Sequence, residues 1–271
     1  MARSREFILF KQKKGEYSHK ELFYLLVLFF GSLIVAAILS GPICLILNSS
    51  DSVIAKRMVG RGICKIYGRI VLVTALIALP FFFSKCGIRK LEEIGCDFRN
   101  IKSILKWTCV GVLFSILLLG IKVIFGNTIL VCNVDTLGVL SKRLPWFVLC
   151  AALIGIFEEI LFRGAVLRAF YTAFNPTLAI VASAMFFAYA HIKVPSAANV
   201  GNESIGFLSG FRCVIPTLFG FLYNFKVFQF VKLTLFGIIL SLITFKNKSL
   251  NQAIGFHAGT VLMLSIARVF T

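Results

Sequence analysis

Two adjacent glutamates and an arginine lie inside a long apolar stretch of this sequence, where ionisable side chains are rare. Glu158, Glu159 and Arg163 fall within about a turn and a half of a predicted helix. A charged side chain at the centre of a bilayer costs about 2.5–3.5 kcal/mol on insertion scales, so such residues are usually functional. The spacing of Glu159 and Arg163 predicts an i,i+4 ion pair along one helix face. Glu158 lies about 100° around the helix from Glu159 and faces another direction.

This arrangement indicates proton-transfer chemistry. A carboxyl group in an apolar, poorly solvated environment binds a proton more readily than one in water. A group that exchanges its proton near neutral pH is suited to general base or acid catalysis. Glu158 has no counter-ion on its own helix in this interpretation, and it is therefore the candidate for proton transfer. A structural ion-pair network that holds helices together is the alternative interpretation.

Two of the three histidines also fall at or inside apolar helices. His191 follows Phe187 by four residues, so the two rings share one helix face. His257 lies between Gly255 and Gly259, and small residues at that spacing allow two helices to approach closely. Each histidine alone is more often a hydrogen-bonded packing residue. In combination with an intramembrane glutamate pair, they indicate a shared site.

The elements that must position these residues are apolar helices, because 59% of the 271 residues are apolar and only 15% are charged. A soluble domain carries about 25% charged residues. The sequence therefore predicts an all-α, polytopic transmembrane helical bundle of about seven or eight helices. The spans are expected at residues 22–47, 70–84 (with a start as early as 63), 105–125, 146–170, 178–191, 227–245 and 250–270, with a short apolar segment at 214–225.

Along the chain, we expect a basic cytoplasmic tail at residues 1–20, transmembrane helices at 21–144 and a core at 145–271 that contains the candidate site. Residues 86–106 are expected to be a loop with room for one amphipathic helix, and the stretch from 126 to Pro145 is expected to be a short loop. The eight cysteines show neither a CxxC pair nor zinc-ribbon spacing. Most of them lie in or beside apolar runs, where a thiol behaves as a small hydrophobe, so no disulfide framework is expected.

The basic composition indicates contact with lipid headgroups. Lys and Arg number 29 against 11 acidic residues, which gives a formal charge of +18. Most of these bases lie in the connections between apolar runs, a placement typical of anchoring at the membrane surface. No pattern of stacking aromatic residues accompanies the charge, so nucleic acid is not an expected partner. The expected partners are the lipid bilayer and a peptide or protein substrate, and the sequence leaves the oligomeric state open.

Three segments together resemble the signature of the CPBP family, which includes the CAAX prenyl proteases of the Ras-converting type and the Abi bacteriocin-immunity proteins. The segments are Glu158-Glu159-x-x-x-Arg163, Phe187-x-x-x-His191 and the third-helix His257. The similarity covers residues 145–269, nearly half of the chain. It implies an intramembrane endopeptidase that hydrolyses a peptide bond of a membrane-associated substrate, CAAX-type substrates included. The expected location is a bacterial inner (plasma) membrane, crossed several times.

The resemblance also implies a catalytic role for five residues. Glu158 would activate the attacking water, with His191 helping to hold and polarise it. Glu159 and Arg163 would pair to orient the site. His257 would help to stabilise the tetrahedral oxyanion, which requires a donor directed at the developing charge.

One position departs from the family pattern. Where the family commonly has an asparagine four residues after the last histidine, this chain has Val261. Losing an oxyanion donor typically costs about 10²–10³ in rate. Asn224 or Asn251 is a candidate donor from another segment. The alternative function is a non-catalytic immunity or scaffold protein of the membrane that retains the charged network.

Two further interpretations are less favoured. Two histidines and a glutamate could compose a zinc site, but the sequence contains neither HExxH nor HxxEH, and the cysteines do not gather near the histidines. We therefore expect no cofactor and no metal. A transporter could use the same residues as a proton relay, but the chain lacks an inverted repeat or paired broken helices.

Overall fold

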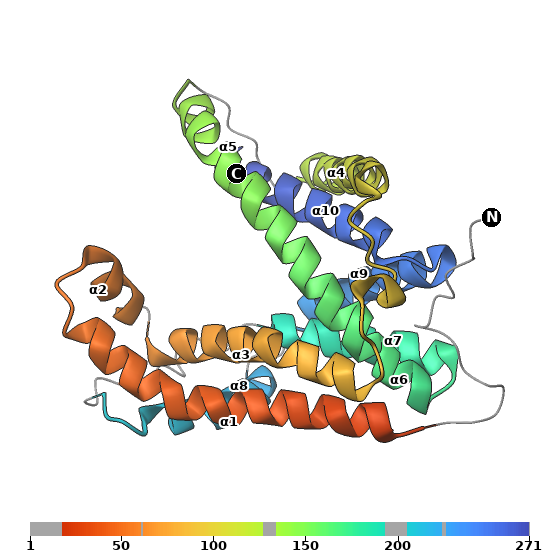
Figure 1. The fold of residues 1–271 in the computed structure, drawn as a ribbon. Coiled ribbons are helices and arrows are strands. Elements are labelled where there is room, and N and C mark those ends of the chain that lie inside the picture. The colour runs from red at the N-terminus through yellow and green to blue at the C-terminus, as the bar shows by residue number, and fades with distance from the viewer. Residues whose placement is uncertain (1–17, 61, 127–133, 193–204, 224–225, 271) are drawn as a thin grey trace. The chain divides into compact units, whose positions relative to one another are not determined.

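The computed structural model describes residues 18–60, 62–126, 134–192, 205–223 and 226–270. Within these ranges every regular element is a helix, which confirms the all-α prediction (Figure 1). The α-helices are α1 (Lys20–Asn48), α2 (Val53–Val59), α3 (Ile63–Lys85), α4 (Ile101–Ile124), α5 (Val134–Glu159), α6 (Leu167–Ala173), α7 (Pro176–His191), α8 (Val214–Tyr223), α9 (Val227–Asn247) and α10 (Leu250–Phe270). The segments η2 (Leu91–Ile94) and η5 (Ser209–Cys213) are 3₁₀-helices, and η3 (Ile160–Val166) is a π-helix.

Six helical stretches in the described part of the chain are long and apolar enough to cross a membrane. They are α1, α3, α4, the continuous stretch Thr136–Ala173, α9 and α10, and α7 is a shorter apolar helix. This set agrees with the predicted polytopic bundle of seven or eight helices, and the protein is an integral, multi-pass membrane protein. The second span begins at Ile63, the earlier of the two predicted starts. The basic tail at 1–17 lies outside the described residues.

The prediction of a loop up to Pro145 is wrong from residue 134 onward. Helix α5 begins at Val134 and continues through the proline. A proline removes one backbone hydrogen bond from a helix interior. Transmembrane helices tolerate this loss, because neighbouring groups satisfy the freed carbonyl. Pro42 in α1 and Pro80 in α3 are accommodated in the same way. A proline inside a long apolar run therefore does not mark a helix end in this chain.

The loop between α3 and α4 is largely as expected. It contains only the short η2, and α4 begins at Ile101, a few residues before its predicted start. The reason is local, because the Asn100 side chain accepts a hydrogen bond from the Ser103 backbone N–H and caps the helix.

Among the described residues, the first of two compact units comprises 88–126, 134–168 and 238–270. Within it, α10 packs against both α4 and α5. A Cβ atom at Gly255 would collide with the Ile104 carbonyl oxygen, and one at Gly259 with that of Thr108, so α10 touches the α4 backbone directly. This confirms the close helix approach predicted from the two glycines. Residue 257 lies about 200° around α10 from Gly255, and so faces away from α4.

The start of α10 is fixed by the loop that precedes α4. The Asn251 amide donates to the Asp97 carbonyl oxygen at 2.6 Å, and its oxygen accepts from the Asp97 backbone N–H at 3.1 Å. The backbone N–H of Leu250 donates to the Gly95 carbonyl oxygen at 2.8 Å. These bonds tie the first turn of α10 to a loop more than 150 residues earlier, and they fix where the residues of α10 lie along their neighbours.

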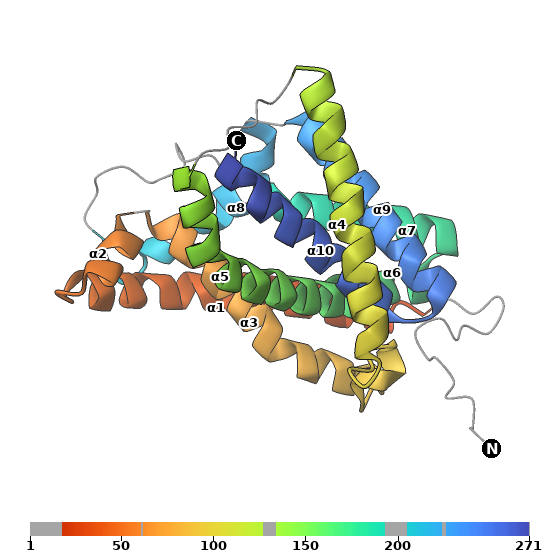
Figure 2. The same ribbon diagram turned by 90° about the horizontal axis from the view of Figure 1, so that it is seen from above.

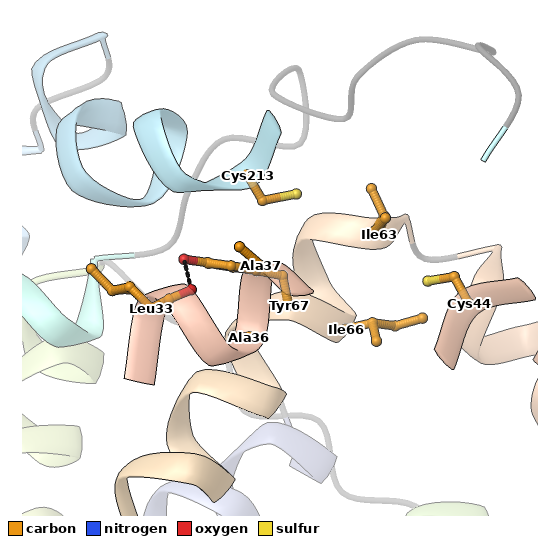
Figure 3. Packing of buried hydrophobic residues seen from close by; sticks show 8 residues of the cluster. All are labelled: Leu33, Ala36, Ala37, Cys44, Ile63, Ile66, Tyr67 and Cys213. Carbon is orange, nitrogen blue, oxygen red and sulfur yellow. Dashed lines mark hydrogen bonds between the residues drawn. The ribbon is translucent and has the colours of Figure 1, made fainter. Parts of the chain in front are cut away.

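The second compact unit comprises the described residues between 18 and 87 and between 169 and 237. Helices α1 and α3 lie side by side in both views (Figure 1, Figure 2), and η5 packs on both of them. Tyr67 is fully buried and its hydroxyl donates to the Leu33 carbonyl oxygen at 3.2 Å (Figure 3). The predicted boundaries of the chain's parts at residues 20 and 144 stay predictions.

Cys64, at the start of α3, and Cys213, at the end of η5, form a disulfide with their Cα atoms 5.3 Å apart. The expectation that the cysteines form no disulfide is therefore wrong for this pair. The two residues are 149 positions apart, so no short spacing motif could have revealed the bond. Five other cysteines of the described residues form no disulfide, namely Cys44, Cys86, Cys96, Cys109 and Cys150.

Candidate active site

The two glutamates lie where α5 gives way to the π-helix η3. Glu158 and Glu159 are the last residues of α5, and Arg163 lies within η3. At the end of η3, the Leu167 N–H donates to the carbonyl oxygen of Phe162, five residues earlier. In an α-helix the acceptor lies four residues earlier. Such wider turns are rare and occur frequently at functional sites. No spacing in the sequence distinguishes this segment from an ordinary α-helix, so sequence analysis missed it.

Glu159 and Arg163 form the predicted ion pair. The Glu159 Oε1 atom accepts a hydrogen bond from Arg163 Nη1 at 2.8 Å. Glu159 is 0% exposed and Arg163 is 1% exposed. A buried charge is strongly unfavourable unless it is paired and hydrogen-bonded. The pair therefore accounts for how two ionised groups can remain inside this apolar unit.

His257 joins the same carboxylate from α10. Its Nδ1 lies 2.7 Å from Glu159 Oε1, the oxygen that also accepts from Arg163. An ionised carboxylate can only accept, so the Nδ1–H of His257 is the donor. Because Gly255 and Gly259 place α4 on the opposite side of α10, the imidazole is directed at α5. The hydrogen bond fixes both the orientation of the ring and its tautomer.

Glu158 lies at the other nitrogen of the same ring. Its Oε2 atom is 3.8 Å from His257 Nε2, longer than a direct hydrogen bond. The side chain of Glu158 is 19% exposed, whereas that of Glu159 is 0% exposed. Helical spacing predicts no partner for Glu158 on its own helix. The structure supplies a neighbour from a helix almost 100 residues away, which helical periodicity cannot reveal.

The second oxygen of Glu159, Oε2, is buried and accepts no hydrogen bond within the described ranges. Buried carboxylate oxygens are normally satisfied by a donor or by an ordered water. This atom therefore marks the side of the carboxylate on which a water molecule or another donor would be stabilised.

His191 is the last residue of α7 and belongs to the second compact unit. Its Nδ1–H donates to the Phe187 carbonyl oxygen at 2.8 Å, and the two rings lie 4.2 Å apart. The predicted sharing of one helix face by these residues is thus confirmed. This bond places the lone pair of the neutral ring on Nε2. A role for His191 beside Glu158 stays a prediction.

The residues that could replace the missing asparagine either make other hydrogen bonds or lie outside the described residues. The Thr260 hydroxyl donates to the Phe256 carbonyl oxygen of its own helix at 2.9 Å. Asn251 uses both ends of its amide on the backbone of Asp97, nearly two turns before His257. Asn251 therefore holds the start of α10, and its replacement of the missing asparagine stays a prediction. Asn224 lies outside the described residues.

Sequence analysis also missed Gly155, one turn before Glu158 on α5. A Cβ atom there would lie 3.0 Å from the Ala258 Cβ and 3.0 Å from the Ile254 carbonyl oxygen. The missing side chain allows α5 and α10 to approach closely enough for His257 to reach Glu159. Its signal in the sequence was a small residue three positions before the glutamate pair, which is too common to be diagnostic.

Metal binding is a separate question. In the described portions of the chain, no group of three or more His, Cys, Asp or Glu side chains is placed to hold a metal ion. Independence from a metal stays a prediction that a chelator experiment can test.

These features define a class, that of multi-pass helical membrane proteins with a buried Glu–Arg–His centre between two helices. A family model described as type II CAAX prenyl endopeptidase Rce1-like matches residues 140–263. The match includes the glutamate pair, Arg163, His191 and His257, so the resemblance to the CPBP family is confirmed over the segment that carries the site. This family is one of membrane proteases. Neither a curated protein nor a solved structure matches the chain.

Proposed function

We propose that this protein is an intramembrane endopeptidase that hydrolyses a peptide bond with water activated by Glu158. The observation that carries the proposal is the series of contacts from Arg163 through Glu159 and His257 to Glu158. Three members of this series are almost completely buried, and the fourth, Glu158, is partly exposed. A rigid, paired network that ends in one accessible carboxylate is the arrangement that general-base catalysis requires.

Each residue then has a distinct task. Arg163 donates a hydrogen bond to Glu159, and Glu159 holds the His257 ring with its Nε2 toward Glu158. Glu158 takes a proton from water as the water oxygen bonds to the carbonyl carbon of the substrate. The tetrahedral intermediate carries an oxyanion, to which His257 can donate when its Nε2 is protonated. The carbon–nitrogen bond then breaks, and Glu158 returns the proton to the leaving amine. No metal or cofactor takes part in this scheme.

The proposed substrate is a membrane-associated peptide or protein. The name of the matching family specifies CAAX prenyl substrates, and we extend this to the chain as a candidate substrate class. Hydrolysis at Glu158 requires a bond that reaches the end of α5, inside a stretch long enough to span the bilayer. We further propose a bacterial inner (plasma) membrane as the location.

The experiment that tests the proposal compares wild type with Glu158→Gln in an in-membrane cleavage assay. The substitution keeps the shape and hydrogen-bonding capacity of the side chain but cannot accept a proton from water. Cleavage is expected to fall by about 10² or more, the scale of general-base catalysis. Glu93→Gln is the matched control, because this glutamate lies in η2 and accepts a hydrogen bond from the Arg89 backbone N–H. EDTA is expected to leave the rate unchanged.

A non-catalytic immunity or scaffold protein is the second candidate, favoured by one observation. Position 261 carries a valine, and the neighbouring Thr260 hydroxyl is used within its own helix. If wild type cleaves none of a broad panel of membrane-associated peptides while Glu158→Gln retains full biological function, the network is structural. The scaffold is then the correct interpretation.

A further inference from the structure

A groove of about 230 Å³ runs between α1 and α3 in the second compact unit. It extends along α1 from Tyr24 to Val35 and is floored by Leu28 and Ser32. Its opposite wall is formed by α3, where Phe81 is 60% exposed. The two helices lie side by side along its length (Figure 2).

The lining of this groove favours an apolar occupant. Two of its three hydroxyl groups are already satisfied by their own helices. Ser32 donates to the Leu28 carbonyl oxygen at 2.7 Å, and Thr74 donates to that of Ile70 at 2.8 Å. The third hydroxyl belongs to Tyr24, and the rest of the lining is mainly aliphatic and aromatic carbon, which is most stable in contact with hydrocarbon.

The length of the groove matches one leaflet of a bilayer. Tyr24 and Val35 are eleven residues apart, which corresponds to about 16 Å along a helix. Half of the ~30 Å hydrocarbon core of a membrane is about 15 Å. A single acyl chain from one leaflet would therefore fill the groove from end to end.

One end of the groove is basic and aromatic. Lys85, on the last turn of α3, places its ammonium 5.2 Å from the centre of the Phe81 ring. His19 and Lys20, at the start of α1, lie beside Tyr24 around a second hollow. The only carboxylate in the first turn of α1 is Glu21. Lysines beside aromatic rings at a helix end are typical of the headgroup level, where they attract anionic lipids.

We propose that this groove is a binding site for an anionic phospholipid. Its acyl chain lies along α1 and α3, and its phosphate lies at Lys20 and Lys85. The site is independent of peptide hydrolysis, so its loss leaves the proposed protease activity of the purified protein unaffected in detergent.

The test is photocrosslinking of the full chain in phosphatidylcholine nanodiscs that contain a phosphatidylglycerol with a diazirine in the middle of its acyl chain. Crosslinked peptides are mapped by mass spectrometry and are expected to come from α1 and α3. Gly31 lines the groove, and a Cβ atom there meets no atom within 4 Å. Gly31→Leu can therefore fill the groove without a clash, and labelling is expected to fall about tenfold, the scale of excluding two methylene groups.

Gly68→Leu is the matched control, because Gly68 also has open space at its Cβ but does not line the groove. Ala78→Leu fills the groove from the α3 wall and protects the test against a folding defect specific to Gly31. Lys85→Gln is expected to lower the preference for phosphatidylglycerol over a phosphatidylcholine probe with the same tail by about fivefold.

Labelling of α1 and α3 that is unchanged in both Gly31→Leu and Ala78→Leu overturns the proposal, as does labelling spread evenly over all lipid-facing helices. Equal labelling by the two lipid probes in wild type overturns the assignment of an anionic headgroup. Stronger labelling of the groove by a diazirine-bearing isoprenoid than by either phospholipid overturns the assignment of an acyl chain.

Discussion

The helix pairs α1–α3 and α5–α10 are both buried contacts between membrane helices, but different forces stabilise them. Between α1 and α3 the contact is largely apolar, with hydrogen bonds from Tyr67 to the Leu33 carbonyl oxygen and from Thr74 to the Ser32 carbonyl oxygen. Between α5 and α10, close packing at Gly155 allows the buried Glu159 to reach His257. Apolar contacts are non-directional and tolerate changes that conserve volume. A buried charge tolerates no change that removes its partner.

The contrast implies that the cost of a substitution depends on charge in one pair and on volume in the other. Charged groups inside a membrane are retained where they perform a function. The α5–α10 pair thus maintains a costly network in a place where leucine and alanine would suffice for folding. This supports the assignment of the site to that pair.

The largest effect is expected for Arg163→Ala, which leaves the Glu159 carboxylate buried with one partner fewer. Breaking a buried ion pair by removing one partner costs about 3–5 kcal/mol. Folded yield and melting temperature in detergent should both fall, together with any cleavage. A combined Arg163→Met and Glu159→Gln variant, which removes both charges, should recover much of the stability. Normal melting of Arg163→Ala would show that the pair does not stabilise the α5–α10 contact.

Val261→Asn tests whether the α5–α10 pair lacks an oxyanion donor. If the valine has removed an oxyanion donor, restoring the asparagine should raise a weak cleavage rate by up to about 10²–10³. The measurement is the initial rate of peptide cleavage in nanodiscs, with Val261→Leu as the control for volume. A rate that responds equally to both variants would assign the effect to packing instead.

His191→Gln tests the second histidine. As a group proposed to hold and polarise the water, it should contribute about 10² to the cleavage rate, the lower range for acid–base assistance. His19→Gln is the matched control, since His19 lies at the start of α1 and contacts Phe174 edge to face. Unchanged cleavage by His191→Gln, with normal folding, would exclude the residue from the catalytic set.

The smallest effect is expected for Tyr67→Phe in the α1–α3 pair. The substitution removes only the hydrogen bond to the Leu33 carbonyl oxygen and keeps the buried ring. The cost should be about 0.5–1.5 kcal/mol, the net value of one hydrogen bond. Thermal unfolding in detergent measures it. A loss comparable to that of Arg163→Ala would remove the proposed difference between the two helix pairs.

The features that could be predicted from the sequence are those encoded within one or two helical turns. Long apolar runs located the spans, and α10 begins and ends where its run does. The i,i+4 spacing predicted the Glu159–Arg163 pair. Gly255 and Gly259 predicted the close approach of α10 to a neighbouring helix. Local rules extend no further than such spacings, because side-chain periodicity describes one helix at a time.

The features that could not be predicted depend on which distant segments meet. The bond from His257 to Glu159 joins residues 98 positions apart, and the bond of Cys64 to Cys213 joins residues 149 apart. The clamp of Asn251 on Asp97 is of the same kind. Without a partner helix, the face of α10 that carries His257 could have met any neighbour. The π-helix is a local element, but its formation depends on how the surrounding segments pack and not on a residue pattern.

The π-helix η3 also has a consequence for the length of the chain. A turn closed by i→i+5 bonds contains one more residue than a turn closed by i→i+4 bonds. Residues after Val166 are therefore rotated by about 100° relative to an uninterrupted continuation of α5. Deleting one residue from Ile160–Val166 would restore a continuous α-helix and yet turn every later side chain to the wrong face. The number of residues between Glu159 and α6 is therefore constrained, and not only the identity of the charged residues.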